Sequence, residues 1–410
     1  MSSPRVIIVG GGAAGFFAAI AAAELGAEAT MLEKTSRFLE KVRISGGGRC
    51  NVTHACFEPR DFATRYPRGD RELLGPFHKF SARDTVAWFE SRGVKLKTED
   101  DGRMFPTTDS SQSIVSCLMD AAHSAGVNLR LNSTVESITK LPDGTFEITV
   151  ASKSDAAGEK MFCDRILLAT GGCRAAAAGQ LAVTLGHTLE PPVPSLFTFQ
   201  IESPWLRELA GVSSIAEVSV PAAKLRERGP VLVTHWGLSG PAILRMSAWG
   251  ARVLHDLNYQ FSLVVNWLPE SNAKKIQEEF QARRESAGAK LLVNVPLPPL
   301  TARLWEQLVL AAGIARDARW ATLTRSQAQA LEQQLMRTEF TVTGKSLNKD
   351  EFVTCGGVNL GEVNFKTMES RICPGLFFAG ELLDIDGITG GFNFQAAWTT
   401  GFIAGRAIAA

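Results

Sequence analysis

The chain has 410 residues, of which 45% are hydrophobic and 21% charged, and its formal net charge is +1. At about 150 residues per domain, this length predicts two or three domains with buried cores. The balanced charge argues against a nucleic-acid partner or an anionic membrane surface. The sequence contains no run of about 18 apolar residues that could span a membrane. The apolar stretch near the N-terminus is too short for a signal peptide. We expect a cytoplasmic protein with a small-molecule substrate; its oligomeric state is open.

The first segments predict a βαβ unit. A buried strand from Arg5 to Val9 leads into an alanine-rich helix from Ala13 to Leu25, and a second strand runs from Glu28 to Leu32. Two further helices are expected from Ser81 to Arg92 and from Ser110 to Ala125. This order is typical of an α/β fold.

Three strands are expected next, over residues 128–137, 145–150 and 166–169. The pattern then changes at Pro191, which is followed by Pro192 and Pro194. Because proline breaks a helix, this cluster suggests that the chain crosses there into another domain.

The middle of the chain alternates between two patterns. From Leu196 to Val265, short strands separated by turns favour a small antiparallel barrel or sandwich. From Glu270 to Gln334 the pattern is helical, and a strand returns from Phe340 to Thr343. After Thr354 the chain becomes glycine-rich, and it ends in a helix that begins at about Gln395.

The strongest motif lies between the first strand and the first helix. Gly10, Gly12 and Gly15 fit G-x-G-x-x-G in the context that this motif needs. Gly10 permits the tight turn, Gly12 lets a pyrophosphate approach the backbone, and Gly15 lets the helix pack closely. The free N–H groups of the helix N-terminus would bind the phosphates. Glu33 ends the second strand and would accept hydrogen bonds from ribose hydroxyls, so FAD or NAD fits better than NADP.

Three later segments decide between the two dinucleotides. Ser45 to Asn51 forms a second glycine loop with Arg49 as a phosphate partner, and Ala169 to Gly172 ends a buried strand in small residues. Gly375 to Gln395 contains an apolar strand followed by a glycine turn that opens the last helix. Such a helix N-terminus can stabilise negative charge near N1 and O2 of a reduced flavin, which favours FAD.

These segments resemble the flavoprotein superfamily of glutathione-reductase-like fold. More narrowly, K-x-x-x-S-G-G-G-R-C-N (residues 41–51), T-H-x-G-L-S-G-P (234–241) and G-L-x-F-A-G-E-x-L-D-x-x-G-x-x-G-G-F-N (375–393) resemble the aminoacetone-oxidase-like family of NAD(P)/FAD-dependent oxidoreductases over nearly the whole chain. The resemblance implies a Rossmann-like FAD-binding domain (1–190 and 350–410), an inserted β-barrel-like domain (191–268 and 336–349) and a helical subdomain (269–335). Arg43, Phe392 and Phe394 depart from the family pattern and could alter substrate choice.

The resemblance also implies a set of residues that contact FAD. They are Gly10, Gly12, Ala14, Gly15, Glu33, Lys34, Lys41, Ser45, Gly47, Gly48, Arg49, Asn51, Thr170, Gly171, Gly380, Glu381, Asp384, Gly391, Asn393, Phe394 and Gln395, with Val135 as an adenine-side backbone contact. For Asp384 and Asn393 the alternative is a cap of the last turn.

Catalytic groups other than the flavin are not identified by the sequence. His235 lies in a loop that could reach the flavin or could be a structural turn, and Arg103 could bind an anionic group or be a solvated loop residue. The seven cysteines include no C-x-x-C pair, which argues against a disulfide framework and against a metal site. Cys50 and Cys56 could form a redox pair, but a packed thiol at Cys50 is the favoured interpretation.

The predicted function is hydride transfer between flavin N5 and a small organic substrate, such as an amine, an alcohol or an activated alkene. The chain shows no second G-x-G-x-x-G after Pro191, so NAD(P)H is considered only as a transient electron donor. Two alternatives remain: an NAD-dependent dehydrogenase without flavin, and a non-catalytic flavin-binding sensor module.

Overall fold

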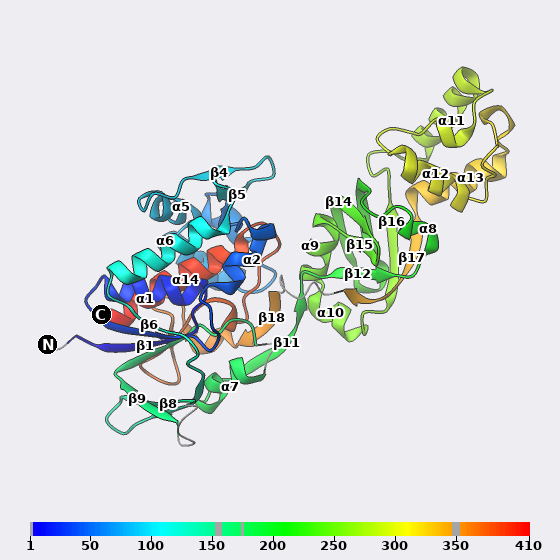
Figure 1. Ribbon diagram of the computed structural model, residues 1–410. Coiled ribbons are helices and arrows are strands. Elements are labelled where there is room, and N and C mark those ends of the chain that lie inside the picture. Colours follow the sequence, from blue (N-terminus) through cyan, green and yellow to red (C-terminus); the bar gives the residue numbers. More distant parts are fainter. Residues whose placement is uncertain (1–2, 152–157, 174–175, 347–352) are drawn as a thin grey trace. The chain divides into compact units, whose positions relative to one another are not determined.

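The computed structural model describes residues 3–151, 158–173, 176–346 and 353–410, and the chain divides into two compact units. The first unit contains Met1–Ser195 and Lys349–Ala410, and the second contains Leu196–Asn348. The N-terminal and C-terminal segments therefore belong to the same unit. In Figure 1 the blue N-terminal elements and the red C-terminal elements lie together in this unit.

A seven-stranded sheet forms the centre of the first unit. Its strand order is β19-β20-β21-β10-β1-β2-β6, and the strands from β21 to β6 are parallel. Strands β1 and β10 are almost wholly buried, which explains their continuous apolar sequences. The strands are β1 Arg5–Val9, β2 Glu28–Leu32, β6 Asn128–Arg130, β10 Arg165–Leu168, β19 Val363–Asn364, β20 Glu369–Ser370 and β21 Leu376–Phe378.

Helices α1 (Ala13–Ala23) and α14 (Phe392–Ala409) lie side by side in this unit (Figure 1). Glycines permit their close approach. A Cβ atom on Gly401 would lie 2.4 Å from the carbonyl oxygen of Ala14, and one on Gly405 would lie 2.3 Å from that of Ala18. The first and last helices of the unit therefore pack backbone against backbone, which brings both chain ends to one place.

Smaller elements surround this sheet. The helices are α2 Glu40–Gly48, α3 Pro59–Ala63, α4 Asp70–Lys79, α5 Ala82–Glu90, α6 Ser111–Ser124 and α7 Ala176–Thr184, with 3-10 turns at Leu360–Glu362 and Gly380–Leu382. The remaining strands are β3 Thr53–His54, β4 Leu96–Thr98 and β5 Arg103–Pro106 in one sheet, β7 Val135–Lys140, β8 Phe146–Val150 and β9 Glu159–Cys163 in another, and the pair β11 Leu189–Ser195 and β18 Val353–Val358.

The second unit is a closed six-stranded barrel with helices attached. The barrel order is β12-β15-β14-β13-β16-β17, with β12 Thr198–Ile201, β13 Ser213–Val220, β14 Leu225–Thr234, β15 Gly237–Ser239, β16 Phe261–Asn266 and β17 Thr338–Ser346. The helices are α8 Pro204–Arg207, α9 Pro241–Trp249, α10 Ala251–Asp256, α11 Ala273–Ala287, α12 Ala302–Ala311 and α13 Arg325–Met336, with 3-10 turns at Pro221–Ala223, Leu292–Asn294 and Trp320–Thr322.

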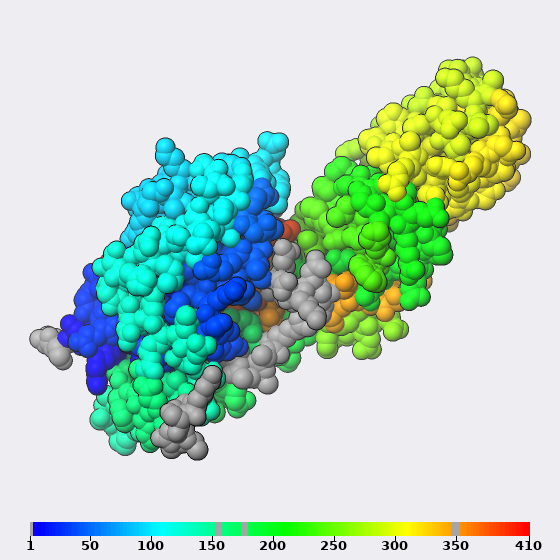
Figure 2. Space-filling view, in the orientation of Figure 1, coloured from blue at the N-terminus to red at the C-terminus, as the bar shows by residue number. Residues whose placement is uncertain are grey.

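The barrel and the helices between β16 and β17 share one hydrophobic core. Trp267, Trp305 and Trp320 are fully buried in it. The indole N–H of Trp305 donates to the carbonyl of Leu292 at 2.7 Å, so its polar atom is satisfied. Figure 2 shows these helices (yellow) as a lobe continuous with the barrel.

The structure confirms the βαβ opening, the helices near 81–92 and 110–125, the barrel strands and the C-terminal helix. It corrects two expectations. Residues 241–256 form helices, because Ala242, Ile243 and Met246 place an apolar face toward the barrel at helical spacing. The strand expected over 128–137 is two strands, since the chain turns at Asn132, whose φ is +53°.

The chain leaves the first unit after Ser195, and the proline cluster lies within β11, where the pairing register shifts between Glu190 and Val193. A separate helical subdomain over 269–335 stays a prediction. Among the described residues, no helix has the length and apolar character needed to cross a membrane.

Candidate flavin site

The glycine motif forms a tight loop between β1 and α1. Gly10 has φ +114°, and a Cβ atom there would lie 2.3 Å from the carbonyl oxygen of Ala169. A Cβ atom on Gly15 would lie 2.0 Å from the carbonyl oxygen of Gly10. At Gly12, by contrast, a Cβ atom would meet nothing within 4 Å. Gly10 and Gly15 are therefore required by packing, whereas Gly12 leaves its backbone face open to a ligand.

Glu33 supports this loop from the end of β2. One of its carboxylate oxygens accepts from the backbone N–H of Gly11 at 2.8 Å, and the other accepts from the N–H and the hydroxyl of Thr35 at 2.9 and 2.8 Å. The following residue, Lys34, is exposed. The β6–β7 turn crosses the same strand end, because the N–H of Ser133 donates to the carbonyl of Glu33 at 2.8 Å. Val135, half-buried, begins β7 two residues later.

The second glycine loop lies at the end of α2. Gly46, Gly47 and Gly48 have φ values of +57°, +67° and +82°, and Ser45 through Gly47 depart from helical geometry. A Cβ atom at Gly47 or Gly48 would meet nothing within 4 Å, so this backbone is also open. The hydroxyl of Ser45 donates to the carbonyl of Val42 at 3.0 Å.

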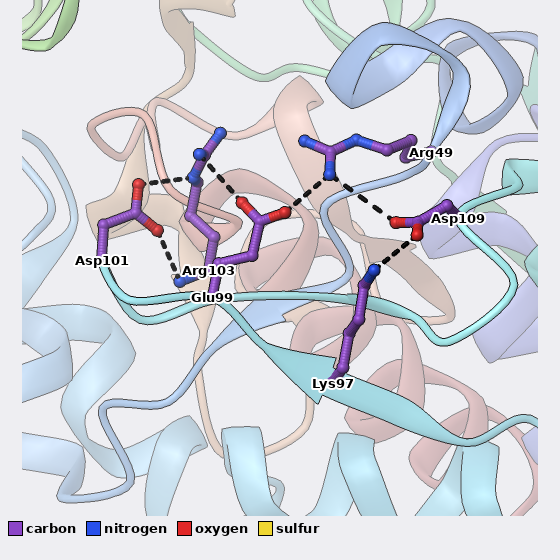
Figure 3. A network of polar contacts seen from close by, with 6 residues as sticks. All are labelled: Arg49, Lys97, Glu99, Asp101, Arg103 and Asp109. Atoms are coloured by element: carbon purple, nitrogen blue, oxygen red, sulfur yellow. Dashed lines mark hydrogen bonds and ion pairs between the residues drawn. The ribbon is translucent and has the colours of Figure 1, made fainter.

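Arg49 takes part in a charged network rather than standing free (Figure 3). Its guanidinium lies 2.6 Å from Glu99 and 3.7 Å from Asp109, and it stacks on the ring of Phe105 at 4.0 Å. Arg103 joins the same network through Glu99 at 3.0 Å. A phosphate at Arg49 would compete with two carboxylates.

The rest of the network explains the position of Arg103. It contacts Asp101 at 2.7 Å, and Lys97 pairs with Asp109 at 2.5 Å (Figure 3). Burial alone would raise the pKa of Asp101, but its hydrogen bonds with Arg103 bring it below its usual value. Three cations and three carboxylates thus fix the loop between β4 and β5, and Arg103 is a member of this scaffold.

Strand ends β10 and β21 meet the glycine loops. Thr170 is half-buried, and Gly171 has φ +79° with open space at its Cβ position. A Cβ atom on Gly380, which follows β21, would lie 2.8 Å from the Cβ of Ala14 in α1. The end of β21 and the start of α1 are therefore neighbours.

Lys41 and Glu381 connect two of the sequence motifs. The ammonium of Lys41, on α2, lies 2.6 Å from one carboxylate oxygen of Glu381. The other oxygen accepts from the N–H of Thr354 at 2.9 Å. The side chain of Lys41 is 58% exposed and that of Glu381 is 20% exposed, so this pair lies at the rim of the site.

Three side chains in the first turn of α14 contact the segments around its N-terminus. Asn393 accepts from the N–H of Gly387 at 2.8 Å and donates to its carbonyl at 2.9 Å. Gln395 is fully buried and accepts from the hydroxyl of Thr53 at 2.6 Å. Phe394 stacks on Trp398, with ring centroids 5.5 Å apart. Asn393 thus holds the backbone of the turn, whereas Gln395 ties the helix to the side chain of Thr53.

Asn51 ties the second glycine loop to this turn. With its amide oriented to satisfy both neighbours, it accepts from the N–H of Gly391 at 2.9 Å and donates to the carbonyl of Thr53 at 3.0 Å. Gly391 has φ +93°, and a Cβ atom there would lie 2.5 Å from the same carbonyl. Nearby, Asp384 is almost fully buried.

A buried ion pair in the same loop was missed by the sequence interpretation. Asp386 is fully buried, pairs with Arg68 through both carboxylate oxygens, and accepts from the hydroxyl of Ser195 at 2.7 Å. Burial raises the pKa of Asp386, although Arg68 and Ser195 act in the opposite direction. The sequence motif specified Asp384 but not Asp386, and no neighbouring residue indicated the partners of Asp386, which lie 318 and 191 residues away.

His54 was also passed over. Its ring stacks on Phe392 with centroids 4.8 Å apart, and its Nε2 lies 3.1 Å from the carbonyl oxygen of Asp101. Burial lowers the pKa of His54. His235, by contrast, is exposed in the turn between β14 and β15 of the second unit. Burial raises the pKa of Cys50 to about 12, so this thiol is protonated at neutral pH.

Together, these residues line the carboxyl ends of β1, β10 and β21 and the N-termini of α1 and α14. This is the edge where open α/β sheets bind dinucleotides. The open backbone at Gly12, Gly47, Gly48 and Gly171 fits a long ligand with a pyrophosphate, as FAD has. Among the described residues, no cluster of three or more His, Cys, Asp or Glu side chains could hold a metal ion. The fold and the site thus define a dinucleotide-binding protein of the Rossmann type.

Comparison with known proteins identifies the dinucleotide as FAD. The chain belongs to the HI0933-like family of FAD-binding proteins, since the model of the HI0933-like protein Rossmann domain matches residues 4–407. The likeness supports an FAD-dependent oxidoreductase. A closer relation to aminoacetone oxidase, or to glutathione reductase, stays a prediction.

Two curated relatives match over nearly their full lengths. The chain is 30% identical over 424 residues to the 3-dehydro-bile acid delta(4,6)-reductase of Clostridium scindens, covering 99% of both chains. It is 31% identical over 405 residues to the ribosomal RNA dihydrouridine synthase of Escherichia coli, covering 96% of this chain and 95% of that one.

Solved structures show the same fold. The 3-ketosteroid delta1-dehydrogenase of Sterolibacterium denitrificans aligns with a TM-score of 0.55 at 12% identity, with 100% of both chains covered. The 3-ketosteroid-delta4-(5alpha)-dehydrogenase of Rhodococcus jostii RHA1 aligns with a TM-score of 0.53 at 14% identity, covering 99% of this chain and 97% of that one.

Proposed function

We propose that this protein reduces a carbon–carbon double bond conjugated to a carbonyl group, with FAD as the cofactor and NAD(P)H as the electron donor. The observation that supports this proposal most strongly is that two relatives, each about 30% identical over nearly the whole chain, have names that denote this chemistry. One name specifies a reductase of double bonds in a 3-oxo steroid acid, and the other specifies formation of dihydrouridine from a uridine.

Both reactions add two electrons and two protons, as a hydride and a proton, across a C=C bond. A hydride adds to the carbon β to the carbonyl, a proton adds to the α carbon, and the C=C bond becomes a single bond. When bound and reduced by NAD(P)H, FAD would supply this hydride, and solvent would supply the proton. The activated alkene is therefore favoured over the amine that resemblance to aminoacetone oxidase would suggest.

The side chains of this chain bind and orient the cofactor. The open N–H groups from Gly12 onward would hold the pyrophosphate, and Glu33 would hold the adenosine ribose. The start of α14 directs free N–H groups and a partial positive charge outward, which favours an anionic ring edge. Asn51 and Asn393 fix this N-terminus by bonding to the backbone of Gly391 and Gly387, which precede it.

An anaerobic spectroscopic titration tests the proposal. NADPH or NADH should bleach the flavin absorbance of the purified protein, and a 3-oxo-4,6-diene steroid or a uridine oligonucleotide should restore it without oxygen. The reduced product should carry two additional hydrogens by mass spectrometry. If conjugated alkenes never restore the absorbance, but a primary amine bleaches the oxidised protein, the proposal is wrong and amine oxidation replaces it.

A further inference from the structure

A shallow depression lies on the second unit, between the start of β14 and the end of α9. It has a volume of about 270 Å³ and is lined by Lys224, Leu225, Arg226, Glu227, Met246 and Trp249. Drug-sized ligands occupy pockets of about 300–1,000 Å³, so this depression suits a smaller group, such as one base of a longer chain.

Trp249 provides an exposed aromatic face at this depression. It is 44% exposed, whereas Met246, one helical turn earlier, is fully buried beneath it. The backbone that follows is tightly packed, since a Cβ atom on Gly250 would lie 2.3 Å from a methyl group of Leu225. The indole ring is therefore held on a rigid backbone rather than on a free loop, as a stacking platform requires.

Cations border the same ring. Lys224 and Arg226 are both exposed, and the side chain of Arg226 is 71% exposed. The carboxylate of Glu217 lies 3.6 Å from Arg226, which is a long and solvent-exposed contact. The acidic residue in the depression, Glu227, is paired with Arg245 at 3.1 Å. The positive charge of Lys224 and Arg226 is thus available to an anionic ligand.

The charge of the whole chain conceals this asymmetry. Residues 196–348 contain 17 Lys and Arg against 13 Asp and Glu, although the full chain has 43 against 42. The second unit is therefore basic and the first is acidic. The expectation that nucleic acid is excluded rested on the total charge, which does not reveal how the charge is distributed.

We propose that this depression anchors single-stranded RNA, with a base stacked on Trp249 and its phosphates beside Lys224 and Arg226. An aromatic face with flanking cations is the usual way in which proteins bind single strands. This inference rests on the proposed function, because it assigns the substrate class, a uridine within RNA, and places an RNA anchor on the second unit.

Fluorescence anisotropy with the FAD-loaded full-length protein tests the anchor. The probe is a labelled uridine-rich 12-nucleotide RNA at 50–200 mM salt. Trp249→Ala should weaken binding about tenfold, and Trp249→Phe should retain most of the affinity. The double variant Lys224→Gln/Arg226→Gln should reduce the slope of log K against log salt by about 1–2.

Two exposed residues of the same unit supply controls. Trp236 is 67% exposed in the β14–β15 turn, and the side chain of Lys274 on α11 is 86% exposed. Trp236→Ala and Lys274→Gln should each change the RNA affinity less than about twofold. The proposal is overturned if the wild-type protein fails to bind at 50 mM salt, or if Trp249→Ala binds as tightly as the wild type. Reoxidation by a small conjugated alkene, measured without RNA, reports on the proposed function independently and should be unchanged in Trp249→Ala.

Discussion

Two alanine substitutions in one glycine loop should have opposite consequences, because the structure gives the two glycines different roles. Gly12 has φ −93° and open space at its Cβ position. Gly12→Ala should therefore leave the apoprotein folded, at a cost below about 1 kcal/mol as an N-cap change. Gly15→Ala would place a Cβ atom 2.0 Å from a backbone oxygen, where ordinary contacts are 3.4–4 Å. The resulting shift should cost about 1–3 kcal/mol or more.

FAD binding, in contrast, should be weakened by Gly12→Ala. At a free FAD concentration of about 100 Kd, binding adds about 2.7 kcal/mol of stability to the wild-type protein. For a domain of this size, that raises Tm by roughly 5–11 °C. A methyl group on Gly12 meets the pyrophosphate rather than the protein, and a penalty of up to about 3 kcal/mol weakens FAD binding roughly 100-fold. At the same FAD concentration, Gly12→Ala should then gain only about 1 °C.

Thermal melts of the two apoproteins, with and without FAD, measure both quantities. Gly12→Ala should melt near the wild-type apoprotein and respond little to FAD, and Gly15→Ala should melt several degrees lower. A full FAD-induced shift in Gly12→Ala would refute the reasoning, because the pyrophosphate would then not approach the backbone at this glycine.

Three further predictions concern stability and cofactor binding. Asp386→Ala leaves Arg68 without its buried partner and should cost about 3–5 kcal/mol in urea unfolding, whereas the apolar double variant Arg68→Met/Asp386→Leu should recover most of that loss. Stability should also fall as the pH drops below about 6.5, because burial lowers the pKa of His187, so the unfolded chain takes up a proton that the folded chain does not. Burial alone would raise the pKa of Glu362, but hydrogen bonds from a neighbouring threonine and from His187 hold it below 4.5 and extend the loss to lower pH. Urea midpoints from pH 4 to 8 measure this dependence, and an unchanged slope in His187→Asn would contradict it. Lys41→Gln should lower the free energy of unfolding by less than about 1 kcal/mol, since its ion pair with Glu381 is largely exposed. It should nevertheless raise the Kd for FAD, measured by flavin fluorescence. An unchanged Kd would place Lys41 outside the cofactor site.

The local chemistry of the glycine motifs could be inferred from sequence alone. Gly10, Gly12 and Gly15 stand between a strand and a helix, and this order predicted which of them must lack a side chain for packing. The apolar strand before Gly380 and the glycine turn before α14 were equally visible. Such features depend on neighbours within a few residues, so their sequence pattern carries the information.

Side-chain roles depended on partners that are distant in the chain. The phosphate contact expected of Arg49 stays a prediction, and the fold adds Glu99 and Asp109 as partners of its guanidinium. Asn393 was expected to contact the flavin or to cap the last turn. In the structure its side-chain amide accepts from the N–H of Gly387 and donates to the carbonyl of Gly387. The sequence supplied the residue types, and the tertiary structure decided with which groups they pair.

The amino-acid sequence by itself determined the strand–glycine–helix motif of a dinucleotide-binding fold, because the conformational freedom of glycine and the period of apolar residues act locally. That both chain ends belong to one domain was implied only by the family resemblance, and the structure shows it. Only the tertiary structure decided the pairing of Arg68 with Asp386 and the exposure of Trp249 beside two cations. Burial and electrostatic partnership arise when segments hundreds of residues apart come together, and no short stretch of the chain encodes that event.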